Sequence, residues 1–309
     1  MQPATTAFGE GTMKLVADVG GTNVRFALAE GARILPQTIR AFRNDDFATF
    51  YAAADHYLAE AAPGALDRVC VAVAGPVTGD HARLTNRDWS FQIERLIENY
   101  APEARLINDL EALGYSVPSL SADGVRMVTE GTPAWGNQAL VAGIGTGFNV
   151  SPVVIRDDGP VVPKAEMGHV QLAARIHEAV SARAKGAAHG FETVEHLFSG
   201  RGFERLWHLS TGRSETPAKL MGSDDAEMVD HVIFYAGLMA MLAQDLTLAF
   251  LPGQGIHFAG GVARAVLQNG GGPAFAEAYG RPLALDTAWH VPVKLILDDT
   301  AALAGCAAA

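Results

Sequence analysis

An Asn-Asp pair, Asn108 and Asp109, stands where an apolar stretch gives way to a helical pattern. Leu106 and Ile107 predict the end of a buried strand, and Leu110–Val117 predicts a helix. A carboxylate at the C-terminal edge of a strand faces the crevice in which open α/β sheets bind ligands, and there it can take a proton from an incoming hydroxyl. Asn and Asp are also good helix caps. On these residues alone, a capping role therefore stays open beside a catalytic one.

A turn of small residues, Gly20, Gly21 and Thr22, separates two apolar strands predicted at Leu15–Val19 and Asn23–Ala29. Without bulky side chains, the backbone N–H groups of such a turn can approach an anion closely. Asp18 lies beside the turn, where a carboxylate could hold a Mg²⁺ ion through water. An ordinary hairpin with a Gly-Gly turn explains the same residues.

A second turn, Gly145-Thr146-Gly147, lies in a similar setting. The stretch L-V-A-G-I-G-T-G-F-N-V at Leu140–Val150 resembles L-V-A-D-V-G-G-T-N-V at Leu15–Val24, which indicates an internal repeat on the scale of a domain. Two such turns facing each other would hold one polyphosphate. The glycines match neither the P-loop nor the G-x-G-x-x-G fingerprint, which argues against P-loop and Rossmann proteins. A strand, Gly260-Gly261 and a helix start form a third candidate loop for a nucleotide.

Three further polar residues follow the second turn. Glu166 and His169 are three apart around Met167-Gly168, and Glu195 lies in a helix-like segment before a Ser-Gly-Arg-Gly break at 199–202. A zinc site needs more ligands than this pair supplies. Glu166 and His169 could reach ligand hydroxyls from a turn, although a surface hydrogen-bonding pair fits equally well. An exposed helical glutamate such as Glu195 is usually only solvated.

Composition and charge limit the class of protein. The chain has 309 residues, 49% apolar and 18% charged, which predicts a globular protein of two domains or lobes. The net charge of −11 offers no basic stripe, which argues against nucleic acid as a partner. Cys70 and Cys306 match no metal or redox spacing and suit a reducing cytosol. Residues 1–12 lack the pattern of a signal peptide. We expect the apolar run Met228–Leu251 to be a core helix, not a membrane span, because it contains polar residues.

The remaining pattern alternates strands with helices, which predicts an α/β fold. Strands are expected at Arg68–Ala74 and Val293–Leu297, a helix at Ser90–Tyr100, and a long helix that Asp224 or Asp225 caps. The residues from 119 to 137 are loop-like.

Taken together, these stretches resemble the bacterial glucokinases of the hexokinase–actin–Hsp70 superfamily, from about Lys14 to Gly305. Each motif is weak alone, but the set stands in the order of the family. The motifs are D-V-G-G-T-N at Asp18–Asn23, G-P-V-T-G-D at Gly75–Asp80, T-N-R-D-W-S-F at Thr85–Phe91, I-N-D at Ile107–Asp109, G-T-G at Gly145–Gly147, E-M-G-H-V at Glu166–Val170, E-H-L-F-S-G at Glu195–Gly200 and A-G-G-V at Ala259–Val262.

The resemblance implies a two-lobed α/β fold of the ribonuclease H-like, actin-like ATPase class with its active site in the cleft between lobes. We expect a small domain at 13–109 plus 298–309 and a large domain at 110–297. The implied reaction is ATP-dependent phosphorylation of D-glucose at its 6-hydroxyl, the entry to glycolysis, in a cytoplasmic homodimer with no membrane partner.

The resemblance also assigns roles to residues of this chain. Asp109 is the implied general base, and Asp18 lies near Mg²⁺. The sugar hydroxyls are bound by Asn108, Glu166, His169 and Glu195. The phosphates of ATP are bound by two turns, Gly20, Gly21, Thr22 and Asn23 and Gly145, Thr146 and Gly147. Gly260 and Gly261 lie near the adenosine.

Two departures from related proteins matter. Asn149 stands where the family usually has a small residue. Beside the phosphates, its larger side chain is expected to change the affinity for ATP or the choice of phosphoryl donor. The Cys-rich zinc motif and the N-terminal helix-turn-helix of the related repressor-and-kinase family are absent from the sequence. This favours the zinc-free glucokinase branch. A kinase of another hexose, such as mannose or an amino sugar, and a sugar-binding regulator without turnover remain the alternatives.

Overall fold

The computed structural model describes residues 11–84, 87–132, 134–186, 188–282 and 290–309. These residues form two compact units. Unit 1 contains the described part of Met1–Leu120 together with Ile155–Val162 and Asp299–Ala309, and unit 2 contains that of Ser121–Val154 and Pro163–Asp298. The expected domains, 13–109 with 298–309 and 110–297, differ from these units mainly at residues 110–120 and 155–162, which lie in unit 1.

Unit 1 is built on a sheet with strand order β3-β2-β1-β5-β9, and β4 also pairs with β2. The hairpin β1–β2 is antiparallel, while β1, β5 and β9 run parallel. The strands are β1 (Met13–Val19), β2 (Asn23–Glu30), β3 (Arg33–Ile34), β4 (Arg40–Arg43), β5 (Arg68–Val73) and β9 (Glu103–Asn108). Because β1, β5 and β9 are parallel, their carboxyl ends meet at one edge, where Val19, Val73 and Asn108 stand in register.

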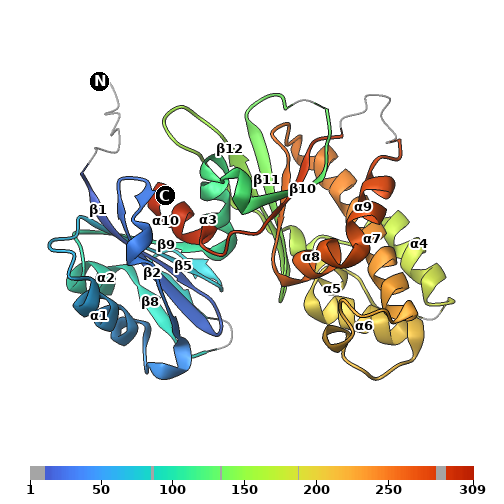
Figure 1. The fold of residues 1–309 in the computed structure, drawn as a ribbon, viewed down its shortest axis with the longest axis horizontal. Helices are drawn as coiled ribbons and strands as arrows, with labels where there is room; N and C mark the ends of the chain where they lie inside the picture. Colours follow the sequence, from blue (N-terminus) through green and yellow to red (C-terminus); the bar gives the residue numbers. More distant parts are fainter. Residues whose placement is uncertain (1–10, 85–86, 133, 187, 283–289) are drawn as a thin grey trace. The chain divides into compact units, whose positions relative to one another are not determined.

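Two groups of helices cover the two faces of this sheet. On one side, Phe50 and Tyr57 of α1 (Phe50–Ala61) pack on Phe26 of β2, with ring centroids 5.6 and 5.1 Å apart. On the other side, α3 (Asp109–Ser116) packs against α10 (Ala301–Ala308), as Figure 1 shows. This contact explains why α3 belongs to unit 1. The remaining elements are α2 (Ile93–Asn99) and a small sheet of β6 (Val77–Thr78), β7 (His81–Arg83) and β8 (Ser90–Gln92).

Unit 2 repeats the arrangement of unit 1. Its strand order is β10-β14-β13-β11-β12, in which the antiparallel hairpin β11–β12 is followed by β13 and β14, parallel to β11. The predicted internal repeat is therefore present as the same hairpin and the same parallel neighbours. The strands are β10 (Val125–Thr129), β11 (Gln138–Ile144), β12 (Phe148–Val154), β13 (Ile256–Ala259) and β14 (Val293–Ile296).

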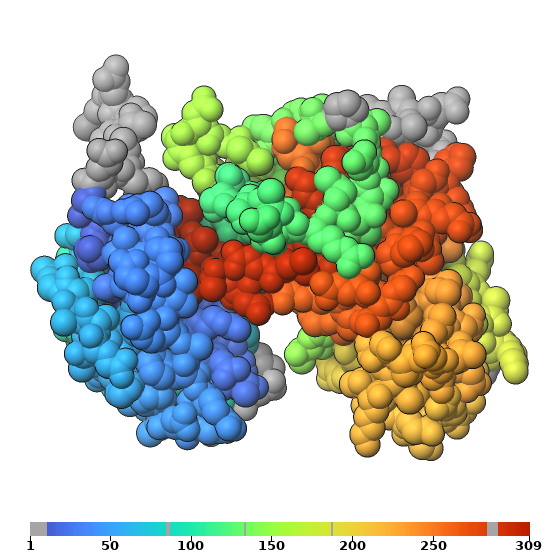
Figure 2. Space-filling view, in the orientation of Figure 1, coloured from blue at the N-terminus to red at the C-terminus, as the bar shows by residue number. Residues whose placement is uncertain are grey.

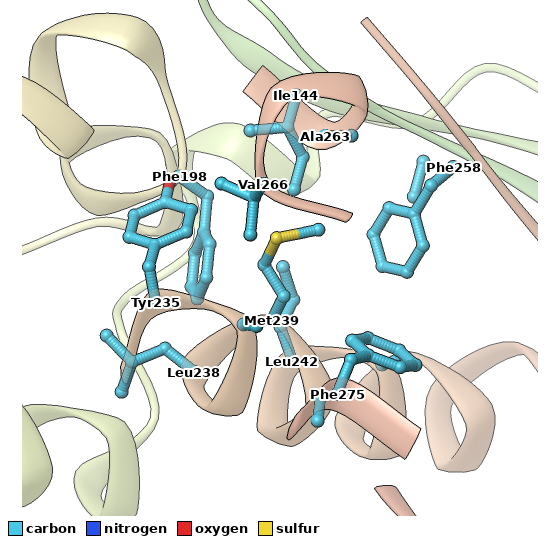
Figure 3. Packing of buried hydrophobic residues seen from close by; sticks show 14 of the residues in the cluster. Ile144, Phe198, Tyr235, Leu238, Met239, Leu242, Phe258, Ala263, Val266 and Phe275 are labelled. Atoms are coloured by element: carbon cyan, nitrogen blue, oxygen red, sulfur yellow. The ribbon is translucent and has the colours of Figure 1, made fainter. Parts of the chain in front are cut away.

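A long buried helix, α7 (Ala226–Phe250), forms the centre of the unit 2 core. In Figure 3, Met239 and Leu242 of α7 point toward Val266, and Tyr235 lies beside Phe198. α7 is long and apolar enough to cross a membrane, but 61% of its most apolar window is buried within the protein, as a core helix requires. The other helices are α4 (Ala174–Arg183), α5 (Val194–Leu197), α6 (Gly200–Thr211), α8 (Gly261–Val266) and α9 (Gly272–Tyr279).

Several local expectations need correction. Ser90–Gln92 is a strand, and the helix begins only at Ile93. The loop-like region contains β10, which joins the sheet edge through β14. The expected break at 199–202 is a helix start, because Ser199 caps α6 by accepting the Gly202 N–H. Asp225 caps α7, as predicted.

Candidate active site

The Asn-Asp pair stands at the carboxyl edge of the unit 1 sheet. Asn108 ends β9 and is also the N-cap of α3, since its Oδ1 accepts the Leu110 N–H at 3.0 Å. Its Nδ2 donates to the carbonyl oxygen of Gly75 at 3.1 Å. The capping role that the sequence left open therefore belongs to Asn108. Asp109 is the first residue of the helix.

The carboxylate of Asp109 is half-buried, with Oδ1 accepting the Leu110 N–H at 2.9 Å. Burial raises the pKa of Asp109 above its usual range, and hydrogen bonds from the backbone of Leu110 and from Asn108 oppose that rise. A carboxyl with a raised pKa is a stronger base than an exposed one, and this one lies at a sheet edge where ligands bind.

Asp18 lies one residue before the end of β1, in register with Ala72 and Ile107. Its Oδ2 is 3.6 Å from the Arg25 guanidinium on the neighbouring strand. Burial raises the pKa of Asp18 to about 6, and the negative charge of Asp109 adds to the rise. Arg25 offsets part of the rise. Asp109 is therefore near enough for its charge to raise the pKa of Asp18.

The turn at Gly20–Asn23 is held from outside by Asn44. The Asn44 Nδ2 donates to the Gly20 oxygen, and its backbone N–H donates to the Thr22 oxygen, both at 2.8 Å. Asn44 is fully buried, while Gly21, Thr22 and Asn23 are exposed. The exposed turn is thus fixed in shape before any ligand arrives. Sequence reasoning missed Asn44, and only its place in a short N-D-D run after a strand hinted at a turn.

Three glycine-containing segments converge at the second turn, Gly145–Gly147, in unit 2. The Gly200 N–H at the start of α6 donates to the Gly145 oxygen at 2.8 Å. Gly260, the N-cap of α8, has φ +92°, and a Cβ there would lie 2.4 Å from the Ile144 oxygen. Only glycine permits both this φ and this approach. The starts of α6 and α8 therefore meet at the turn, where helix N-termini favour anions.

Glu195 of α5 lies directly over this turn. Its Oε2 accepts the Phe148 N–H at 3.0 Å, and a Cβ at Gly147 would sit 2.5 Å from that oxygen. Arg201 near the start of α6 lies 3.9 Å from Oε1. Glu195 is thus not a merely solvated helical residue, because it ties α5 to the first residue of β12.

The E-M-G-H segment packs beside Glu195. Gly168, in the short 3₁₀ turn Met167–His169, approaches β12 so closely that a Cβ would lie 2.3 Å from the Phe148 oxygen. The same Cβ would lie 3.4 Å from the Glu195 Cβ. Glu166 and His169 on either side of Gly168 are exposed. The segment that carries Glu166 and His169 therefore packs against Glu195 through Gly168.

Asn149, two residues after the G-T-G turn, is hydrogen-bonded to a second segment. Its side-chain amide is bonded to the E-M-G-H segment, with Nδ2 donating to the Ala165 oxygen at 2.9 Å and Oδ1 accepting the Met167 N–H at 3.0 Å. The side chain of Asn149 is therefore bonded to the segment that carries Glu166, and its expected effect on ATP stays a prediction. Successive residues of a strand point to opposite faces of the sheet, so the side chain of Asn149 lies on the face opposite to those of Phe148 and Val150.

An apolar pocket of about 370 Å³ lies beside Gly261 in unit 2. It is formed by the starts of α6 and α8 and by residues 216–221. The stretch from α6 to residue 221 is coloured gold at the surface in Figure 2. Walls of this kind suit a flat aromatic ring. The lining includes Phe203, Pro217, Met221, Val262 and Val266.

The candidate residues thus fall into two groups. Asp18, Gly20–Asn23, Asn108 and Asp109 share the carboxyl edge of the unit 1 sheet. The remaining candidates lie at the corresponding edge of unit 2. Thr85 and Asn86 of the T-N-R-D-W-S-F motif lie outside the described residues. In the part of the chain that the structure describes, no group of three His, Cys, Asp or Glu side chains is placed to bind a metal ion.

Two units that each combine a β-hairpin, parallel neighbours and a glycine turn define the actin-like ATPase fold. A solved glucokinase from an Antarctic psychrotroph matches with a TM-score of 0.81 and 26% identity, over 96% of this chain and 98% of that chain. A ROK family glucokinase from Streptomyces griseus, solved with glucose and AMPPNP, matches with a TM-score of 0.61 at 18% identity, over 96% of this chain and 98% of that chain. The latter likeness concerns the fold.

The sequence comparisons name the family. The family model described as glucokinase matches residues 15–309. The glucokinase of Saccharophagus degradans is 31% identical, over 95% of this chain and 97% of that relative. The chain belongs to the glucokinase family.

Proposed function

We propose that this chain transfers the γ-phosphoryl group of ATP to the 6-hydroxyl of D-glucose, with Asp109 as the general base. Membership of the glucokinase family supplies the reaction. The assignment of the base rests on the different roles of the two residues at the end of β9. Asn108 caps α3, and Asp109 keeps a half-buried carboxyl whose pKa is raised.

In this reaction the 6-hydroxyl oxygen attacks the γ-phosphorus, the bond from phosphorus to the β,γ-bridging oxygen breaks, and ADP leaves. Asp109 accepts the proton of the attacking hydroxyl. Phosphoryl transfer needs little covalent help from the protein, so positioning and charge neutralisation dominate. The polar residues at the carboxyl edges of the two sheets suit this demand.

The sugar hydroxyls are assigned to Asn108, Glu166, His169 and Glu195. Oε2 of Glu195 already accepts the Phe148 N–H, and Oε1 is the oxygen we assign to a hydroxyl. The oxygen of Asn108, which caps α3, has a second lone pair for a sugar hydroxyl. Asn108 and Asp109 belong to unit 1, and Glu166, His169 and Glu195 belong to unit 2.

ATP is assigned to the glycine turns and the apolar pocket. The turns Gly20–Asn23 and Gly145–Gly147 would bind the phosphates through backbone N–H groups, helped by the starts of α6 and α8. The pocket beside Gly261 would take the adenine. The Streptomyces griseus glucokinase, which shares the fold, is described with glucose and an ATP analogue, and this supports the assignment.

Magnesium is the implied metal, and Asp18 would hold it through water. Mg²⁺ in such sites uses one or two carboxylates together with substrate phosphates, so it needs no cluster of protein ligands. The residues fit, since burial and the nearby Asp109 raise the pKa of Asp18 to about 6, and a cation would stabilise the ionised forms of both. When bound with ATP, the ion would neutralise charge on the phosphates. A cytoplasmic homodimer acting in glycolysis, without nucleic-acid or membrane partners, completes the proposal.

The test is a release assay for ADP with ATP and a panel of hexoses: glucose, mannose, galactose and glucosamine. We expect turnover to be fastest with glucose, and the position of the new phosphate is read by NMR of the product. Preference for another hexose would keep the chemistry and change the substrate. Binding of glucose by calorimetry without turnover on any sugar would favour a regulator and refute the proposal.

A further inference from the structure

The side chain of Asn149 uses its full hydrogen-bonding capacity at one place. Its two donor hydrogens serve the Ala165 oxygen at 2.9 Å and Glu166 Oε2 at 3.2 Å. Its oxygen accepts the N–H groups of Met167 at 3.0 Å and Val150 at 2.8 Å. An amide offers two donors and two acceptor positions. All four are therefore satisfied by β12 and the segment Ala165–Met167.

This arrangement fixes both the backbone and the side chain of the segment that carries Glu166. The bonds to Ala165 and Met167 hold the backbone on either side of Glu166, while the bond to Oε2 orients its carboxylate. The close approach of Gly168 to the Phe148 oxygen pins the next turn of the segment to the same strand. Glu166 itself is exposed, and an exposed glutamate without such a partner would sample several rotamers.

We propose that Asn149 is a positioning residue that sets the orientation of Glu166 toward the sugar and so contributes to hexose selectivity. The inference rests on the proposed function. A carboxylate held in one orientation binds one arrangement of hydroxyls well, and an epimer leaves it unpaired. Asn149 acts through Glu166 and the Ala165–Met167 backbone, and it contacts no phosphate in this role.

The experiment compares Asn149→Ala and Asn149→Asp with the wild type in steady-state kinetics and in calorimetric binding of glucose without ATP. We expect Asn149→Ala to raise both the KM and the Kd for glucose about tenfold, the size expected for losing one or two hydrogen bonds. The KM for ATP is expected to stay within about twofold. The preference for glucose over mannose and galactose should shrink by a similar factor.

Asn149→Asp separates the hydrogen bonds from the shape of the side chain. Asp is almost isosteric and keeps the acceptor for Met167, but it replaces both donors with an oxygen that faces the Ala165 carbonyl and the Glu166 carboxylate. At about pH 8 like charges would push Glu166 away. We therefore expect the glucose KM of this variant to exceed that of Asn149→Ala.

Gln254→Ala is the matched control. The Gln254 amide also donates to a backbone carbonyl of unit 2, that of Gly136, but at a residue outside the candidate site. It should leave all kinetic constants within about twofold of the wild type. If glucose is phosphorylated but Asn149→Ala changes only the KM for ATP, or changes no constant, the positioning role is wrong. If the wild type phosphorylates no hexose, the proposed function and this inference fail together.

Discussion

Replacing the Asp109 carboxylate with an amide is the sharpest test of the chemistry. In Asp109→Asn the side-chain oxygen can still accept the Leu110 N–H that Asp109 accepts at 2.9 Å, and the volume barely changes. The variant loses the ability to take up a proton from a hydroxyl. A general base contributes about 10²–10⁴-fold, so kcat should fall by that factor, which corresponds to about 2.7–5.4 kcal/mol in the activation free energy.

The same change should not weaken the fold. Burial raises the pKa of Asp109 in the folded protein, so at neutral pH the ionised form is less favourable in the folded than in the unfolded chain. A neutral amide removes that difference. The free energy of unfolding of Asp109→Asn at about pH 8 is therefore expected to equal or exceed that of the wild type.

Steady-state kinetics with saturating ATP, glucose binding by calorimetry and urea unfolding measure the three effects. Asp67→Asn is the matched control, because Asp67 is an exposed carboxylate of unit 1 that also accepts a backbone N–H, from Met13 at 2.8 Å. It should keep wild-type turnover. Should Asp109→Asn retain turnover within about threefold of the wild type, Asp109 is a structural residue of α3 and the proposed base is wrong.

The wild type should show kcat/KM for glucose at least about tenfold above that for mannose or galactose, and a preference for another hexose would contradict this expectation. Glu195→Gln should raise the KM for sugar more than the KM for ATP. Gly305→Ala should lower the free energy of unfolding by about 1–3 kcal/mol or more, because the new Cβ would lie 1.7 Å from the Ala112 oxygen. Gly237→Ala, where a Cβ meets open space in α7, should instead raise the free energy of unfolding by about 0.5–1 kcal/mol. Equal changes in the two variants in urea unfolding would refute this reasoning. Burial lowers the pKa of His231 to about 4, so below about pH 6.5 the unfolded chain takes up the proton first and stability falls with falling pH. His231→Phe should therefore reduce by about 2 kcal/mol the drop in stability between about pH 7.5 and pH 5, and an unchanged drop would mean that His231 does not titrate in this window.

The local pattern of the sequence was sufficient for the elements that carry the chemistry. Apolar runs with glycine turns predicted both hairpins, and the structure confirms β1–β2 and β11–β12 in the same topological setting. The position of Asp109 directly after a strand was predicted from neighbouring residues alone, and β9 ends at Asn108. Local patterns of this kind are readable because strand alternation and turn residues act over a few positions.

Contacts between residues far apart in the sequence were decided only by the tertiary structure. The Gly200 N–H donates to the Gly145 oxygen, 55 positions earlier in the chain. Residues 199–202, which were expected to break the chain pattern, therefore form a helix start beside the second glycine turn. Asn44 holds the turn at Gly20, 24 positions away. The side chain of Asn149 bonds to Ala165 and Met167, 16 and 18 positions further along the chain. A side-chain amide can bond to any backbone group that folding brings near it, so its partner depends on how strands and loops pack, and no local periodicity encodes that.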